Sequence, residues 1–351
     1  MKTLTEKAIA LLHDLISIQS FSSEEDPTAV RIEQWFTEHN IPSKRQDNNV
    51  YAFNAAFDAN KPTLLLNSHH DTVRPNSAYT KDPFHPHIEY GKLYGLGSND
   101  AGGALVSLMA LFTHYYDHPN PKYNLIIAAT AEEESSGPLG LNSLLKTLPP
   151  IDVAIVGEPT LMQLAIAEKG LVVFDGKVKG TASHAAHPNA DNPLLKLPAV
   201  IEWLSHFTFE KESEVLGPVK LTLTQLNAGK QHNVVPAQVD LVIDVRVNDC
   251  YSNQEIVALL QKEAPLELTP RSIDLNSSSI PEEHPLVQAG IALGRETYGS
   301  PTLSDQAKLS CPSLKLGPGD STRSHTADEF IYVNEIEEGI ALYIALLNKI
   351  L

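Results

Sequence analysis

Residues 63–71 read Thr-Leu-Leu-Leu-Asn-Ser-His-His-Asp, a short apolar run that ends in side chains able to bind a metal ion. A fully apolar run of this length predicts a strand that is covered on both faces, as in a parallel sheet. Two more such strands are expected at 125–129 and 153–156, and acidic residues follow both: Glu132-Glu133-Glu134 and Glu158. Strands that lead directly into ligand-type side chains therefore recur along the first half of the chain.

Amphipathic segments separate these strands. Helices are expected near residues 3–16, 26–36, 103–116 and 139–148, the first with a Thr3/Glu6 capping box. This order predicts an α/β fold, a mixed and mostly parallel sheet with helices on both faces. Ligands bind beyond the carboxyl ends of the strands in such a sheet, so the polar side chains there should converge at one edge. Two more candidates join them: Asp100, just before a helix, and His325, after a strand expected at 313–316.

The pattern changes from about Gly170. Longer strands are expected at 171–179, 219–226, 238–247 and 266–275, with helices at 193–206 and 253–262. This β-α-β-β-α-β order is that of a ferredoxin-like α+β unit. After this segment the alternation of helices and short strands begins again, with a helix expected at 285–298. We therefore expect one domain in two parts, residues 1–168 and 280–351, and a second domain, residues 169–279, inserted between them.

Composition narrows the class of protein. The 351 residues carry 26 Lys and Arg against 43 Asp and Glu, a formal net charge of −17. Such a charge disfavours nucleic acid and anionic membranes as partners. No apolar run is long enough for a membrane span, the first residues do not resemble a secretory signal, and the two cysteines cannot form a disulfide scaffold. We expect a cytoplasmic globular enzyme.

The convergent carboxylates indicate what the site binds. Asp100, Glu133, Glu134 and Glu158 would bring four negative charges into one cleft. Two unit charges 4 Å apart repel by about 4 kcal/mol at an effective dielectric constant of 20. Two divalent ions would balance four carboxylates, and mixed imidazole and carboxylate ligands suit Zn²⁺, with Co²⁺ or Mn²⁺ also possible. The dinucleotide, nucleophile-elbow and phosphate-loop motifs are absent from the sequence.

The chain resembles the M20 metallopeptidases, a group that includes zinc aminoacylases and desuccinylases. The resemblance spans nearly the whole chain and is carried by five motifs in order: His69-x-Asp71, Asp100 before Gly102-Gly103, Glu133-Glu134, Gly157-Glu158-Pro159 and His325. The inserted domain adds the family's Gly-x-x-x-His at 180–184. Ser98, Asn99 and Ala101 replace the residues that usually flank the bridging Asp, which leaves the ligand but changes its surroundings.

The resemblance implies a role for each matching residue. One metal would be held by His69, Asp100 and Glu158, and the other by Asp100, Glu134 and His325. Asp71 would orient the His69 ring, and Glu133 would be the general base. His184 would stabilise the oxyanion from the partner subunit, which implies a homodimer formed through the inserted domain. The residues implied to bind substrate are Asn233, Arg246 and Gly319.

The end motif, residues 317–330 with Asp328-Glu329-Phe330, is most similar to the acetylornithine deacetylase branch. We therefore expect a metal-dependent amidohydrolase that removes an acetyl or succinyl group from an ornithine- or citrulline-like amino acid in arginine biosynthesis. Succinyl-diaminopimelate desuccinylase, or another aminoacylase or peptidase of the family, is the alternative within this class. A non-catalytic ligand-binding member of the fold is the alternative outside it, although the presence of Glu133 argues for an enzyme.

Overall fold

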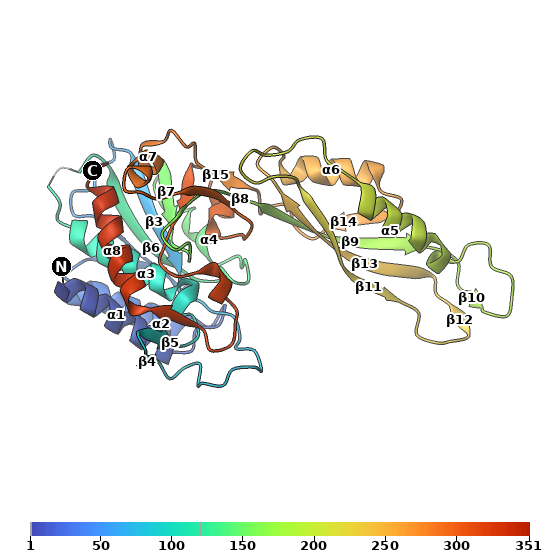
Figure 1. Ribbon diagram of the computed structural model, residues 1–351, viewed down its shortest axis with the longest axis horizontal. Coiled ribbons are helices and arrows are strands. Elements are labelled where there is room, and N and C mark those ends of the chain that lie inside the picture. The colour runs from blue at the N-terminus through green and yellow to red at the C-terminus, as the bar shows by residue number, and fades with distance from the viewer. Residues whose placement is uncertain (1, 120) are drawn as a thin grey trace. The chain divides into compact units, whose positions relative to one another are not determined.

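A computed structural model describes residues 2–119 and 121–351. The chain divides into two compact units (Figure 1). Unit 1 comprises 1–166, 279–298 and 304–351, and unit 2 comprises 167–278 and 299–303. Residues 299–303, which we expected in the first domain, belong to unit 2, where the Lys169 N–H donates to the Ser300 carbonyl (3.2 Å). Of the helices that the structure describes, none combines the length and apolar character needed to cross a bilayer.

A nine-stranded sheet forms the centre of unit 1, and it is mixed, as expected. Its strands are, in spatial order, β1 (Ser43–Gln46), β2 (Asn49–Phe53), β6 (Asn124–Thr130), β3 (Thr63–His69), β7 (Val153–Val156), β17 (Ser313–Lys315), β8 (Leu164–Glu168) and β15 (Ser278–Ser279), and β16 (Thr297–Ser300) also pairs with β8. The neighbours β6, β3, β7 and β17 run parallel to one another. Every residue of β3, β6 and β7 is buried, as their apolar sequences predict.

Helices and loops cover both faces of this sheet. On one face, Leu64, Leu66 and Ile127 pack in a core that includes apolar residues of five helices. These are α1 (Lys2–Ser17), α2 (Asp26–Glu38), α3 (Gly103–Tyr115), α7 (Pro285–Ile291) and α8 (Val333–Leu347). The alternate residues Leu65 and Ile126 pack on the other face, near α4 (Leu141–Leu144). Unit 1 also contains a small sheet of β18 (Phe330–Tyr332), β5 (Lys92–Tyr94) and β4 (His87–Glu89).

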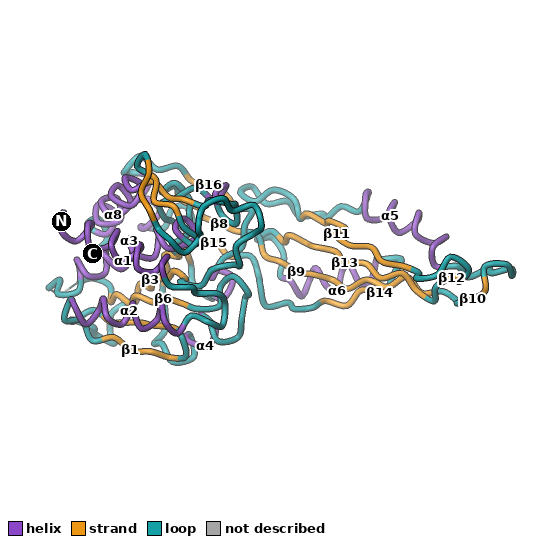
Figure 2. The backbone as a smooth tube through the Cα atoms, turned by 90° about the horizontal axis from the view of Figure 1, so that it is seen from below, coloured by secondary structure: helices purple, strands orange, loops and turns teal. Residues whose placement is uncertain are grey.

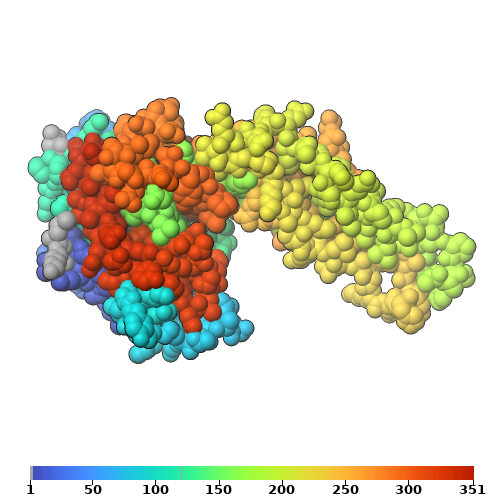
Figure 3. Space-filling model, viewed as in Figure 1, coloured from blue at the N-terminus to red at the C-terminus, as the bar shows by residue number. Residues whose placement is uncertain are grey.

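Unit 2 contains the expected ferredoxin-like order. Its elements are β9 (Gly170–Lys179), α5 (Leu197–His206), β11 (Lys220–Ala228), β13 (Gln238–Val247), α6 (Asn253–Glu263) and β14 (Glu267–Pro270). The strands lie side by side in the order β11-β13-β9-β14 (Figure 2). The two short strands β10 (Ser183–His184) and β12 (Val234–Val235) pair with each other, and their segments lie at the surface of unit 2 (Figure 3).

Several element boundaries differ from the sequence expectation. The helix expected at 285–298 ends at Ile291, because Gly294 adopts a left-handed φ of 78° and the Arg295 N–H turns back to the Gly290 carbonyl. The strand expected at 266–275 stops at Pro270. The helix expected at 139–148 is a single short turn, and α1 begins at Lys2, so Thr3 lies inside it and does not cap it.

Candidate metal centre

The carboxyl ends of the parallel strands carry the predicted ligands of unit 1. His69 is the last residue of β3, Glu133 and Glu134 follow β6, and Glu158 follows β7. These strands are neighbours in register, so their ends meet at one edge of the sheet. Asp100 comes from the short helical turn 98–102 that precedes α3.

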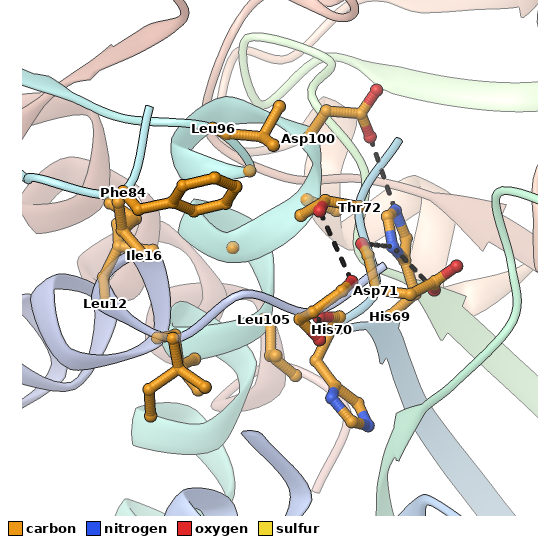
Figure 4. Close-up of a pocket in the computed structure, with 16 residues that line it drawn as sticks. Leu12, Ile16, His69, His70, Asp71, Thr72, Phe84, Leu96, Asp100 and Leu105 are labelled. Carbon is orange, nitrogen blue, oxygen red and sulfur yellow. Dashed lines mark hydrogen bonds and ion pairs between the residues drawn. The ribbon is translucent and has the colours of Figure 1, made fainter. Parts of the chain in front are cut away.

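The first group of ligands surrounds His69. Its Nε2 atom lies 3.4 Å from Asp100 Oδ1 and 3.8 Å from Glu158 Oε1. Figure 4 shows the His69 ring between Asp100 on one side and Asp71 on the other. A small cavity of about 20 Å³ adjoins these residues, and its lining includes His69, Asp71 and Asp100 together with apolar side chains such as Leu12 and Phe84.

The second group surrounds His325. Its Nε2 atom lies 3.5 Å from Asp100 Oδ2 and 3.0 Å from Glu134 Oε2. The two oxygens of Asp100 therefore face the two imidazoles, one oxygen each. This is the arrangement that a bridging carboxylate adopts between two ions.

The geometry fits metal ions. Ligand atoms bound about 2.0–2.2 Å from a tetrahedral zinc ion lie about 3.3–3.6 Å apart. The separations above bracket that range. In addition, His69 Nε2 is buried and has no hydrogen-bond partner among the residues that the structure describes. Because a buried polar atom without a partner costs free energy, an ion at this position would complete the site.

The electrostatics of the carboxylates also favour bound metal ions. Burial, together with the neighbouring Asp100 carboxylate, raises the pKa of Glu158 to about 8. Burial likewise raises the pKa of Glu133 well above its usual range, and Glu158 adds to the effect. A carboxylate cluster of this kind is stable in its ionised form only beside cations.

Asp71 contacts several residues of the site, whereas we expected it to contact only the His69 ring. His69 Nδ1 donates to the main-chain carbonyl of Asp71 (2.9 Å), and the Asp71 carboxylate lies 3.4 Å from the same atom. That carboxylate also accepts the N–H groups of Glu133 (3.0 Å) and Glu134 (3.2 Å) and the hydroxyl of Ser22 (2.7 Å). Asp71 thus accepts the ring N–H of His69 through its main-chain carbonyl, and its carboxylate holds the backbone of Glu133 and Glu134.

Two residues beside the predicted ligands are buried and have structural partners. His70 lies in the loop after β3 and is buried, with Nδ1 2.8 Å from Thr28 Oγ1 and Nε2 2.9 Å from the Asn48 carbonyl. Burial lowers its pKa to about 4, so it is neutral and structural. Glu132 takes no place among the ligands, but it is buried and accepts hydrogen bonds from the Ser23 hydroxyl and the Leu139 N–H.

Sequence reasoning missed two buried carboxylates near the ligands. Asp305 accepts hydrogen bonds from Asn67 of β3 (2.9 Å) and Thr130 of β6 (2.8 Å). Glu329 accepts backbone N–H groups from the turn that carries Asp100. No apolar strand leads directly into Asp305, and Glu329 served only to identify a family branch, so the strand-end signal could not find either.

The predicted oxyanion and substrate-binding residues are not among the residues grouped around His69 and His325. His184 and Asn233 are neighbours in unit 2, because the Ala185 N–H donates to the Asn233 carbonyl (3.0 Å). Arg246 lies far along β13 from them, since at about 3.4 Å per residue the stretch from Gln238 to Arg246 spans about 27 Å. Its guanidinium makes a two-point ion pair with Asp244 (2.9 and 3.1 Å). Gly319 lies in unit 1, beside Asn99.

Comparison with protein families and curated proteins places the chain among hydrolases. Residues 65–349 match the family described as peptidase family M20/M25/M40. A succinyl-diaminopimelate desuccinylase of Cereibacter sphaeroides is 27% identical over 368 residues, covering 95% of this chain and 96% of that protein. A protein of the same name from Helicobacter pylori is 31% identical over 224 residues, covering 61% of this chain and 57% of that protein.

Solved structures share the fold. A metallo-carboxypeptidase of Sulfolobus solfataricus superposes with a TM-score of 0.75 at 16% identity, covering 97% of this chain and 98% of that one. A tripeptidase of Staphylococcus aureus gives a TM-score of 0.77 at 17% identity, covering 98% and 97%. A Bacillus subtilis protein described as a dinuclear metal-binding peptidase gives a TM-score of 0.74 at 16% identity, covering 99% of this chain and 98% of that one. At these identities the likeness shows the fold alone.

Proposed function

The chain belongs to peptidase family M20/M25/M40, and from that premise we propose that it is a two-metal amidohydrolase that releases an acyl group from the α-amine of an N-acyl amino acid. The observation that carries this proposal is Asp100, whose two carboxylate oxygens face His69 and His325. Zinc is the ion that the ligand types favour, with cobalt as a substitute. His69, Asp100 and Glu158 would hold one ion, and Asp100, Glu134 and His325 the other.

The residues of unit 1 suit the hydrolysis of a linear amide. When bound, the two ions would supply Lewis acidity toward the amide carbonyl and increase the acidity of water. We propose Glu133 as the base, and its position supports this role, because one of its oxygens lies within 4.8 Å of ligand atoms of both His69 and Glu158. It would take a proton from the attacking water and deliver it to the leaving nitrogen, giving a carboxylic acid and a free amine.

We propose that His184, Asn233 and Arg246 complete the site from unit 2, and that the active form is a homodimer. Helix α5 and the short helical turn Pro193–Lys196 before it expose apolar side chains, including Leu195 of the turn (76% exposed) and Ile201 of α5 (45%). Strand β11 lies at the edge of the four-stranded sheet, where β13 is its only pairing partner among the described strands. An apolar helix beside a free strand edge is the kind of surface that a second copy covers in a symmetric dimer.

The comparisons favour a succinylated diaminopimelate as the substrate. Two relatives named for that activity, one of them matching nearly the whole chain, support this choice. The Asp328-Glu329-Phe330 ending favours a second candidate, N-acetyl- or N-succinyl-ornithine or -citrulline. All of these substrates share an α-carboxylate and a scissile amide, and they differ in the acyl group and the distal end.

A substrate panel tests the proposal. We expect zinc-loaded protein to release succinate from N-succinyl-diaminopimelate, with kcat/KM at least about tenfold above that for the acetyl and succinyl derivatives of ornithine and citrulline. A factor of ten needs only about 1.4 kcal/mol of transition-state preference, which a single additional hydrogen bond to a charged group supplies. The measurement is kcat/KM for each substrate, with Glu133→Gln protein as the blank.

Two outcomes of the panel would revise the proposal. A preference for an ornithine or citrulline derivative would move the protein to the second candidate. Hydrolysis of di- and tripeptides without hydrolysis of any N-acyl amino acid would make the protein a peptidase and contradict the proposed substrate class.

A further inference from the structure

Glu329 holds the loop that presents the bridging ligand. Its side chain is buried at 2% exposure. Oε1 accepts the N–H groups of Asn99 (2.9 Å) and Asp100 (3.0 Å), and Oε2 accepts the N–H of Gly97 (3.2 Å). Three amides of one short turn are therefore anchored on a single carboxylate, and one of them belongs to Asp100 itself.

Asn99 makes a second connection between the same two segments. Its side-chain amide donates to the Asp320 carbonyl (3.1 Å) and accepts from the Asp320 N–H (3.0 Å). Gly319 leaves the room for this contact, because a Cβ there would lie 2.6 Å from Asn99 Oδ1 and its φ is 95°. Glu329 and Asn99 thus join the turn 97–102 to the segment 319–329, which also carries His325.

From these contacts we propose that Glu329 is a positioning residue that sets the spacing between Asp100 and His325, and so controls the second metal subsite. The inference rests on the proposed two-metal function and assigns Glu329 no direct contact with substrate or ion. It goes beyond that function by naming a residue that decides the relative affinities of the two subsites.

Loss of the Glu329 contacts should weaken metal binding at one subsite more than at the other. His69 is the last residue of the buried strand β3, and Glu158 lies two residues after the buried strand β7, so these strands fix both without help from Glu329. Asp100 and His325 both come from irregular segments, and His325 has a left-handed φ of 59°. Only the subsite formed by Asp100, Glu134 and His325 has two of its ligands on the segments that Glu329 joins.

Two substitutions of Glu329 distinguish a positioning role of its side chain from a role of its negative charge alone. Glu329→Gln keeps one oxygen acceptor but turns an N–H₂ group toward the Gly97 N–H, so one hydrogen bond is lost and a negative charge is removed. Glu329→Asp keeps the charge but shortens the side chain by one methylene, so the carboxylate no longer reaches all three amides. If positioning is the role, both variants are defective, and if charge alone matters, only Glu329→Gln is.

The test is a Zn²⁺ titration of chelator-treated protein by calorimetry. For both variants we expect binding of the first ion to change by less than about threefold and binding of the second to weaken by about 10–100-fold, the usual cost of losing a group that orients a ligand. The matched control is Asp328→Asn, whose carboxylate accepts N–H groups of Thr80 and Lys81, away from Asp100. It should bind both ions as the wild type does, and circular dichroism should show that all three variants are folded.

Three results would overturn the inference: unchanged binding of the second ion in Glu329→Gln, equal weakening of both ions in a folded variant, or wild-type binding by Glu329→Asp. These results differ from a failure of the proposed function. In that case the wild-type protein itself would not bind a second ion.

Discussion

Substitution of Glu133 by Gln is expected to lower kcat for amide hydrolysis by about 10²–10⁴-fold, the usual contribution of a positioned general base. The amide of Gln has nearly the same shape but cannot accept a proton from water. Glu133 is not among the residues proposed as ligands, so the variant should still bind two zinc ions. The measurements are steady-state kinetics on the best substrate of the panel and metal content by mass spectrometry.

Glu132→Gln is the matched control for this variant, because it removes the same charge one residue away. The Glu132 carboxylate faces Ser23 and the Leu139 N–H, so this variant should retain most of its activity at temperatures where it is folded. Unchanged kcat in Glu133→Gln would remove Glu133 from the mechanism. Full activity loss in both variants at equal folding and metal content would show that the charge of the acidic run matters, and not a specific base.

Substitution of His184 by Ala is expected to lower kcat by about 10²–10³-fold, the cost of removing one group that stabilises an oxyanion. Metal content should not change, because His184 lies in unit 2 and the proposed ligands lie in unit 1. A mixed dimer tells which subunit supplies this histidine. Co-expression of differently tagged Glu133→Gln and His184→Ala chains, followed by two affinity steps, yields such dimers.

If His184 acts on the partner's site, one of the two sites in the mixed dimer has both groups intact. Its activity should then be about half that of the wild-type dimer, although each parent variant is nearly inactive. If His184 acts within its own chain, neither site is complete and the mixed dimer should be as inactive as its parents. Failure to isolate any mixed dimer would contradict the homodimer. Loss of metal in His184→Ala would mean that we assigned this residue to the wrong group.

The sequence predicted the structure best in the segments whose residue types are determined by burial. The runs at 63–66, 125–129 and 153–156 are apolar because both faces of these strands are covered, and each proved to be a fully buried strand. Since parallel neighbours end at the same edge, the convergence of His69, Glu134 and Glu158 could also be predicted.

The sequence predicted the structure least well where tertiary contacts determine the end of an element or the partner of a side chain. The helix expected to reach Tyr298 stops early because a left-handed glycine and a neighbouring strand override its periodicity. The burial of His70 depends on contacts with Thr28 and Asn48, partners that no local pattern reveals. Glu329 bonds to amides more than 200 positions earlier in the chain. Composition and periodicity cannot predict such long-range partners.

Zinc binding by the wild-type protein tests the central claim most directly. After removal of metal by a chelator, calorimetric titration at neutral pH is predicted to show two zinc ions per chain, with protons released as each ion displaces them from the buried carboxyl and imidazole groups. Replacing Asp100 by Ala should abolish tight binding of both, because this residue is proposed to ligate each ion. Binding of a single ion, of none, or of two ions that persist without Asp100 would contradict the account.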